Sequence, residues 1–243
     1  ISAFASISDF SISQIEEESE LVQYSIGQKI CLKDIIPDKV LIILSGKARL
    51  LHETNSSGLN KLSTIANLEA DDFIGMASIF KGKSCEFVTA STDLLALSIP
   101  DKLILKIYKE DLKFRNWCNN KLHIADAYEI AVHLISKSPK NIKSLREVVN
   151  DVIDNTSLKT LENGEDIEND TNNINLIGSV NIIENNIFDL LIPNKKINTR
   201  GPLPGRIYQI KKTFYENIIS KNSENRLKSE TEKDKNNKLN IKK

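Results

Sequence analysis

The chain is poor in cysteine, and its few cysteines are badly placed for cross-links. Its three cysteines show no C-x-x-C spacing, which disfavours both a disulfide framework and a structural zinc site. They are Cys31, Cys85 and Cys118. This usage is typical of a reducing compartment, so we expect a cytoplasmic location.

Long apolar runs are also missing. No stretch reaches the roughly 18 apolar residues that span a bilayer, and no secretory signal is visible. The first residue is Ile rather than Met, which leads us to expect a piece of a longer protein. Lys+Arg and Asp+Glu balance at 33 each, so global charge favours neither nucleic acid nor membrane as a partner.

Groups arranged for catalysis are absent. The three histidines, His52, His123 and His133, have no ligand spacing between them, so we expect packing or surface roles and no metal site. The pair Asp71-Asp72 has the character of a turn or helix cap rather than of a catalytic acid pair. No serine lies in a nucleophile-elbow context. We therefore predict a protein that is not an enzyme.

What the chain does have is a regular series of turns from residue 22 to residue 99. β-Branched runs alternate with turn residues at intervals of roughly eight to twelve residues, which is typical of an all-β sandwich or barrel. The turns include Gly27, Pro37-Asp38 and Gly46. The run from Val40 to Leu44 is too apolar for an edge strand, and we expect it at the centre of a sheet.

Helices are expected on both sides of this region. Ser8 and Asp9 open a short amphipathic helix that runs to about residue 21. Pro100 and Asp101 open a second one. A single long helix is expected from Leu112 to Ser136, and its apolar face serves either packing onto the β region or a homodimer contact.

The rest of the chain has a weaker pattern. Residues 139–173 are acidic and rich in Asn, which predicts a linker, although 141–153 could hold one more helix. Residues 174–215 predict a short connector with a β hairpin around Gly178. Residues 216–243 are rich in Lys, Asn and Glu and predict a disordered tail. The first domain then covers residues 1–138.

The first half of the β region resembles the β-roll of the cyclic-nucleotide-binding domain family. The resemblance rests on Gly27-Gln28, on Pro37-Asp38, and on the strand Val40–Leu44 closed by Ser45-Gly46. It implies a mainly β fold, a double-stranded β-helix or jelly roll with flanking helices, and a regulatory role. The physical reason for the two glycines is that tight turns need positive φ.

The second half corresponds to the family's phosphate-binding cassette, in which a loop and a short helix offer backbone N–H groups to the cyclic phosphate. In the family an Arg pairs with the phosphate and a Glu binds the ribose. The resemblance assigns the following positions to a degenerate ligand site: Phe73, Ile74, Gly75, Met76, Ala77, Ser78, Lys83, Cys85 and Glu86.

Both ligand side chains of the family are replaced. Ile74-Gly75 stands where the family has Gly-Glu, and Cys85-Glu86 stands where it has the Arg. A carboxylate repels a phosphate, and Lys81 or Lys83 would lack the planar fork of Arg. No cofactor is therefore predicted, and cyclic nucleotide is the one ligand that the resemblance leaves open.

A narrower resemblance covers the string from Ile74 to Thr92. It is similar to the N-terminal domain of cyanobacterial peptidase-containing ABC exporters, which secrete bacteriocin- or haemolysin-type substrates, and there the loss of the Arg is a feature of the subgroup. This implies a non-catalytic regulatory or docking domain at the inner face of the membrane. Its partners would be the peptidase, membrane and ATPase parts of the transporter, and no nucleic acid.

Two alternatives stay open. Cys85-Glu86 forms either a redox or ligand-sensing spot, or a buried cysteine beside an exposed glutamate. The chain as a whole could instead be a free-standing regulator of the catabolite-activator type. That class needs a helix-turn-helix after Pro139, and the sequence there is acidic and Asn-rich.

Overall fold

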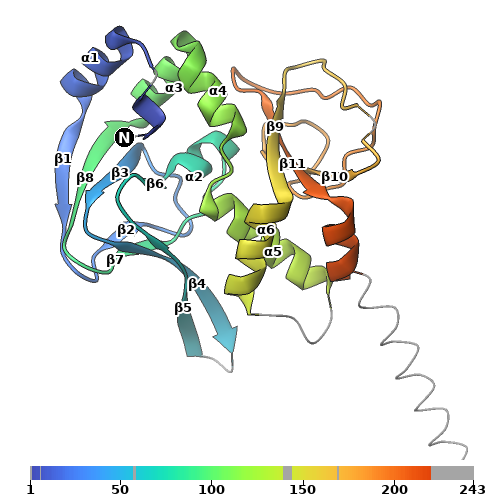
Figure 1. Cartoon of the computed structure of the whole chain (residues 1–243), viewed down its shortest axis with the longest axis horizontal. Coiled ribbons are helices and arrows are strands. Elements are labelled where there is room, and N and C mark those ends of the chain that lie inside the picture. The colour runs from blue at the N-terminus through green and yellow to red at the C-terminus, as the bar shows by residue number, and fades with distance from the viewer. Residues whose placement is uncertain (1, 6, 57–58, 139–143, 169, 220–243) are drawn as a thin grey trace, which may run out of the picture.

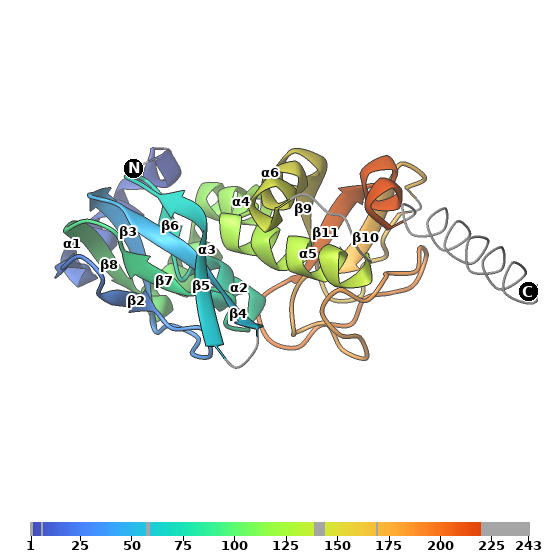
Figure 2. The ribbon, with the colours of Figure 1, turned by 90° about the horizontal axis from the view of Figure 1, so that it is seen from below.

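The computed structural model describes residues 2–5, 7–56, 59–138, 144–168 and 170–219. A β-roll lies at one end of the molecule and a three-stranded sheet at the other (Figure 1). Two helices, α5 (Ile124–Lys137) and α6 (Leu145–Asn155), lie between them, and the view from below shows the same order along the long axis (Figure 2). No helix of the described part is long and apolar enough to cross a membrane.

The roll consists of two four-stranded antiparallel sheets, with the orders β1-β8-β3-β6 and β2-β7-β4-β5. Its strands are β1 (Glu20–Tyr24), β2 (Lys29–Cys31), β3 (Lys39–Ser45), β4 (Ala48–Ser56), β5 (Leu59–Leu68), β6 (Phe73–Ile74), β7 (Val88–Ala90) and β8 (Leu94–Pro100). The apolar run expected at the centre of a sheet is β3, which pairs with β8 on one side and β6 on the other. The predicted fold class is thus confirmed.

Gly46 shows why the turns of the roll can be predicted from the sequence. It lies between β3 and β4 with φ +85°, where side chains are disfavoured. A Cβ atom there would lie 2.2 Å from the backbone oxygen of Asp93. Gly27 has a similar φ of +81° but open space around it, so it is needed only for its conformation.

Short helices flank the roll: η1 (Ser2–Phe4), α1 (Asp9–Glu18), α2 (Met76–Lys81), α3 (Asp101–Glu110) and α4 (Leu112–Asn120). The prediction of one helix from 112 to 136 is wrong, because α4 ends at Asn120 and α5 begins at Ile124. The backbone is extended at Lys121 and His123. The carboxylate of Asp126 accepts the N–H of His123, and this local bond starts the new helix.

The predicted linker at 139–173 is also wrong for its described residues. They include α6, as expected for 141–153, and then strand β9 (Thr156–Leu161). β9 pairs with β11 (Gly205–Lys211), which also pairs with β10 (Asn173–Ile177), in the order β10-β11-β9. The strands become stable because they pair with partners 30 or more residues away, and composition cannot show such partners.

The hairpin expected around Gly178 within 174–215 is present in part, because a bridge between Leu176 and Leu190 and three backbone hydrogen bonds join residues 175–177 to 188–191. β10 also pairs along its whole length with β11, which the sequence did not predict. Of the predicted disordered tail, residues 216–219 end a helical segment that begins at 212, and residues 220–243 lie outside the described part. Phe214, Tyr215 and Ile218 pack against the core, which explains why this stretch is ordered.

The main hydrophobic core runs through both ends of the molecule. One cluster contains Ile43 and Val88 of the roll, Ala131 of α5, Val149 of α6 and Tyr208 of β11. α5 therefore packs on the roll with one part of its surface and on the C-terminal elements with another. The apolar face predicted on 112–136 is used, along α5, for packing within the chain.

Candidate functional site

The cassette positions form a compact unit around helix α2. β6 leads into Gly75, which takes φ +91° and starts the helix, and Gly82, with φ +71°, ends it. A Cβ atom at Gly75 would lie 2.8 Å from the backbone oxygen of Lys39 and 2.9 Å from Cγ of Pro37. Pro37 and Gly75, far apart in the sequence, therefore pack directly against each other, and the helix start admits only glycine.

Glu86 is the central residue of this unit. It is 4% exposed, and its carboxylate accepts a hydrogen bond from the backbone N–H of Gly75 at 2.8 Å. It also accepts from Ser78, through the backbone N–H at 3.2 Å and the hydroxyl at 2.7 Å. The prediction of an exposed glutamate is wrong. The N–H groups at the start of α2, which the family offers to a phosphate, are here bound to the chain's own carboxylate.

Burial governs the acid–base properties of this region. It raises the pKa of Glu86, while the hydrogen bonds from Ser78 and Gly75 act in the opposite direction. Burial, with a further contribution from the nearby charge of Glu86, raises the pKa of Cys31 to about 12 and that of Cys85 well above its usual value. Both thiols stay protonated at neutral pH, which disfavours the redox interpretation of Cys85.

The predicted site residues separate into three groups. Phe73, Ile74, Met76 and Ala77 are buried in the core, so their side chains support the cassette. Gly75, Ser78, Cys85 and Glu86 come together, and the Ser78 hydroxyl lies 3.4 Å from the sulfur of Cys85. Lys83 is exposed on the loop between α2 and β7. Lys81, considered as a substitute for the Arg, is fully buried and forms an ion pair with Glu129.

A cavity of about 230 Å3 lies between the cassette loop, the roll and α5. Two lysines and four carboxylates line it, together with Leu51, Ser84, Cys85, Phe87 and Tyr128. The charged residues are Lys33, Asp34, Glu53, Lys83, Glu86 and Glu129. Ligand pockets usually exceed about 300 Å3, and this one is smaller and net acidic.

Sequence reasoning missed the contribution of α5 to this cavity. Tyr128 and Glu129 line it from the helix, and the Tyr128 hydroxyl lies 2.7 Å from Nδ1 of His52 on β4. No local signal marks these residues, because only the packing of α5 onto the roll brings them there. Among the described residues, no group of three or more His, Cys, Asp or Glu side chains could hold a metal ion.

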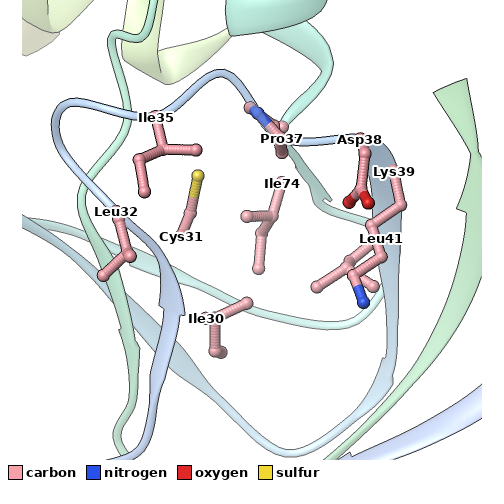
Figure 3. A pocket seen from close by; sticks show the side chains of 10 residues that line it. Ile30, Cys31, Leu32, Ile35, Pro37, Asp38, Lys39, Leu41 and Ile74 are labelled. Atoms are coloured by element: carbon pink, nitrogen blue, oxygen red, sulfur yellow. The ribbon is translucent and has the colours of Figure 1, made fainter.

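A second, smaller cavity of about 150 Å3 lies on the other side of Gly75. Figure 3 shows its mostly apolar lining, with Cys31 among Ile30, Leu32, Ile35 and Ile74. Asp38 and Lys39 are the only charged side chains in this lining. The cavity has the size and polarity for a small apolar group and is unsuited to a phosphate.

Comparison with known proteins supports the fold assigned to the roll. A family model described as cyclic nucleotide-binding domain matches residues 21–111, which is less than half of the chain. The match covers the roll, and the C-terminal sheet lies outside it. No curated protein matches the chain.

Solved structures similar to the chain include three from bacteria. A putative cyclic nucleotide-binding protein from Geobacter metallireducens is 18% identical, with a TM-score of 0.39, over 47% of this chain and 80% of that one. A transcriptional regulator from Thermotoga maritima is 20% identical, with 0.38, over 44% and 82%. The catabolite activator protein of Thermus thermophilus is 15% identical, with 0.40, over 63% and 84%. Scores this low carry no argument about function.

Proposed function

We infer that the chain is a non-catalytic regulatory or docking domain whose nucleotide pocket has lost its ligand. The observation that carries this inference is the position of Glu86, whose carboxylate occupies the N–H donors at the start of α2. A cyclic phosphate would have to displace a buried carboxylate that is covalently part of the chain. It would also meet a net acidic cavity, because four carboxylates and two lysines line it, and no arginine is among the lining residues.

The finer proposal concerns the larger protein. The similarity of residues 74–92 to the N-terminal domain of peptidase-containing ABC exporters supports a role at the inner face of the membrane. There the domain would contact the peptidase, membrane or ATPase parts of such a transporter. The packing of α5 and α6 against the C-terminal strands supports this role, because it gives the roll a folded connection toward later domains.

Calorimetric titration of the whole chain with cAMP, cGMP and cyclic dinucleotides tests the empty pocket. We expect no binding tighter than millimolar. The control is Glu53→Gln, which removes a carboxylate from the same cavity without touching the α2 donors and should leave this result unchanged. Micromolar binding of any of these ligands to the unaltered chain would overturn the proposal and identify a second-messenger sensor.

The exporter context is tested at the gene. A reading frame that continues beyond Lys243 into peptidase, membrane and ATPase domains would support it, and a stop codon directly after Lys243 would overturn it. The remaining proposal on assembly, a homodimer through residues 112–136, is tested by light scattering of the purified chain. A monomer at high concentration would contradict it.

The catabolite-activator alternative requires a DNA-reading helix pair after the roll. In residues 144–168 and 170–219 the structure has α6, a three-stranded sheet and the helical segment from 212. Fluorescence anisotropy with a labelled DNA duplex at low salt separates the two proposals. Salt-sensitive, sequence-selective binding would favour the alternative.

A further inference from the structure

Helix α2 is held at both of its ends by buried charges. At its first turn, Glu86 binds the N–H groups of Gly75 and Ser78. At its last residue, the side chain of Lys81 is completely buried and forms an ion pair with Glu129 of α5. The backbone oxygen of Lys81 also accepts the N–H of Val180, in the segment after β10, at 3.0 Å. The helix is therefore fixed to three different parts of the chain.

The Lys81 ammonium also contacts the C-terminal region. It lies 5.0 Å from the ring centroid of Phe188 and 5.5 Å from that of Tyr208 on β11. Cation–π contacts gain strength when the cation is removed from water, as it is here. Lys81 thus joins α2 to α5 and to the C-terminal sheet at a single point.

One turn before the partly exposed Glu129, α5 carries a carboxylate that is buried. Asp126 is fully buried and accepts hydrogen bonds from the Arg206 guanidinium at 3.2 Å and the Tyr208 hydroxyl at 2.5 Å. Residues spaced three apart lie on the same side of a helix. One face of α5 therefore holds two carboxylates, one bound to a cation from α2 and the other to a cation from β11.

Breaking either pair would leave an uncompensated charge in the interior, which is strongly unfavourable. α2 consequently cannot move away from α5 without disturbing the contacts of β11. The roll and the C-terminal sheet meet through these two ion pairs, in which Lys81, Arg206 and Asp126 are buried and Glu129 is partly exposed.

We propose that Glu86 is an internal ligand of the cassette, an autoinhibitory contact that holds α2 in its anion-bound position without any added anion. Through Lys81, Glu129 and Asp126 it also keeps β11 in place. This deepens the proposed function, since it rests on the pocket being filled from within. What regulates the domain is then whatever displaces Glu86 or pulls on β11, and no diffusible nucleotide is required.

Hydrogen–deuterium exchange of the full chain, followed by mass spectrometry, tests this. We expect Glu86→Ala to speed amide exchange about tenfold or more in α2 and, to a smaller extent, in β11 at 205–211. Acetate should restore slow exchange in this variant, because it supplies the missing carboxylate, and chloride at the same ionic strength should not. Glu53→Gln is the control, and should leave exchange in both segments unchanged.

Two further variants keep the test decisive. Glu86→Gln retains the size of the side chain and replaces the alanine variant if that variant fails to fold. We expect it to speed amide exchange in the same two segments, but by less than Glu86→Ala. In the double variant Lys81→Met/Glu129→Gln, the effect of Glu86→Ala should be confined to α2. Faster exchange in α2 with no change in β11 of the otherwise unaltered chain would overturn the coupling, and no change in α2 would overturn the internal ligand. Nucleotide binding by the unaltered chain is a separate result, which contradicts the proposed function.

Discussion

Two buried carboxylates, one in the cassette and one at the junction with the C-terminal sheet, are neutralised in different ways. Glu86 is surrounded by N–H and O–H donors, and burial raises its pKa. Asp126 is equally buried, but Arg206 and Lys81 hold its pKa below the usual value against the effect of burial. The difference shows that N–H and O–H dipoles allow a carboxylate to be buried but do not offset the rise in its pKa. A full cation beside the carboxylate is needed to lower the pKa below its usual value.

The largest effect on stability is expected from removing the cation that pairs with Asp126, the Arg206 guanidinium. Arg206→Met removes the cation paired with Asp126 and leaves this buried carboxylate with the Tyr208 hydroxyl and the His123 N–H as hydrogen-bond donors. We expect a loss of about 3–5 kcal/mol in the free energy of unfolding. Denaturant titration measures it. Arg200→Met, on the exposed loop before β11, is the control and should stay within about 0.5 kcal/mol. A loss that shrinks as the pH falls would show that Asp126 now takes up a proton; a loss no larger than that of Arg200→Met would contradict the prediction.

A second test asks whether the stability of the roll depends on its backbone conformation, as the stability of the junction depends on its buried charges. Gly46→Ala forces positive φ on a side chain and places Cβ against the backbone of Asp93, so we expect a loss of about 3 kcal/mol. Gly27→Ala has the same conformational strain without the contact, and should lose only about 1 kcal/mol. Thermal unfolding of both variants checks the order. Equal losses would show that the close approach to Asp93 is unimportant.

The junction also contains a buried histidine, His123, whose titration makes the stability of the junction depend on pH. Burial lowers the pKa of His123 to about 4, against an opposing effect of Asp126. The unfolded chain binds the proton more readily, so stability is complete above about pH 6.5 and falls as the pH drops from there toward 4. We expect a contribution on the order of 2 kcal/mol, measured by unfolding at several pH values. His123→Asn should flatten the curve in this window, and an unchanged curve would contradict the assignment.

The smallest effect concerns the segment that composition assigned to a linker. Ser144 caps α6: its hydroxyl accepts the N–H of Glu147 at 3.4 Å, and its own N–H donates to the Glu147 carboxylate at 2.8 Å. Ser144→Ala should cost about 1 kcal/mol, and Glu147→Gln, which keeps an acceptor, should cost less. Circular dichroism during unfolding measures both. Unchanged stability of Ser144→Ala would contradict the contribution assigned to this cap.

Much of the roll could be predicted because its signals are local. Gly46 marks a turn, the run from Val40 to Leu44 marks a central strand, and Ser8 marks the start of α1; each depends on a few neighbouring residues. The break between α4 and α5 was missed because helical periodicity continues across it. The replacements at Gly75 and Glu86 were visible as departures from the family's pattern, but the burial of Glu86 was not.

The sequence by itself determined where the strands and turns of the roll lie and which cassette positions depart from the family's pattern. Only the tertiary structure decided where the remaining charges went. Glu86 became a buried acceptor because the loop that leads into β7 brings it to the start of α2, and Asp126 met Arg206 because β11 returns to α5 from 80 residues further along the chain. The energy of a charge depends on what surrounds it, and those surroundings come from segments that no local pattern connects.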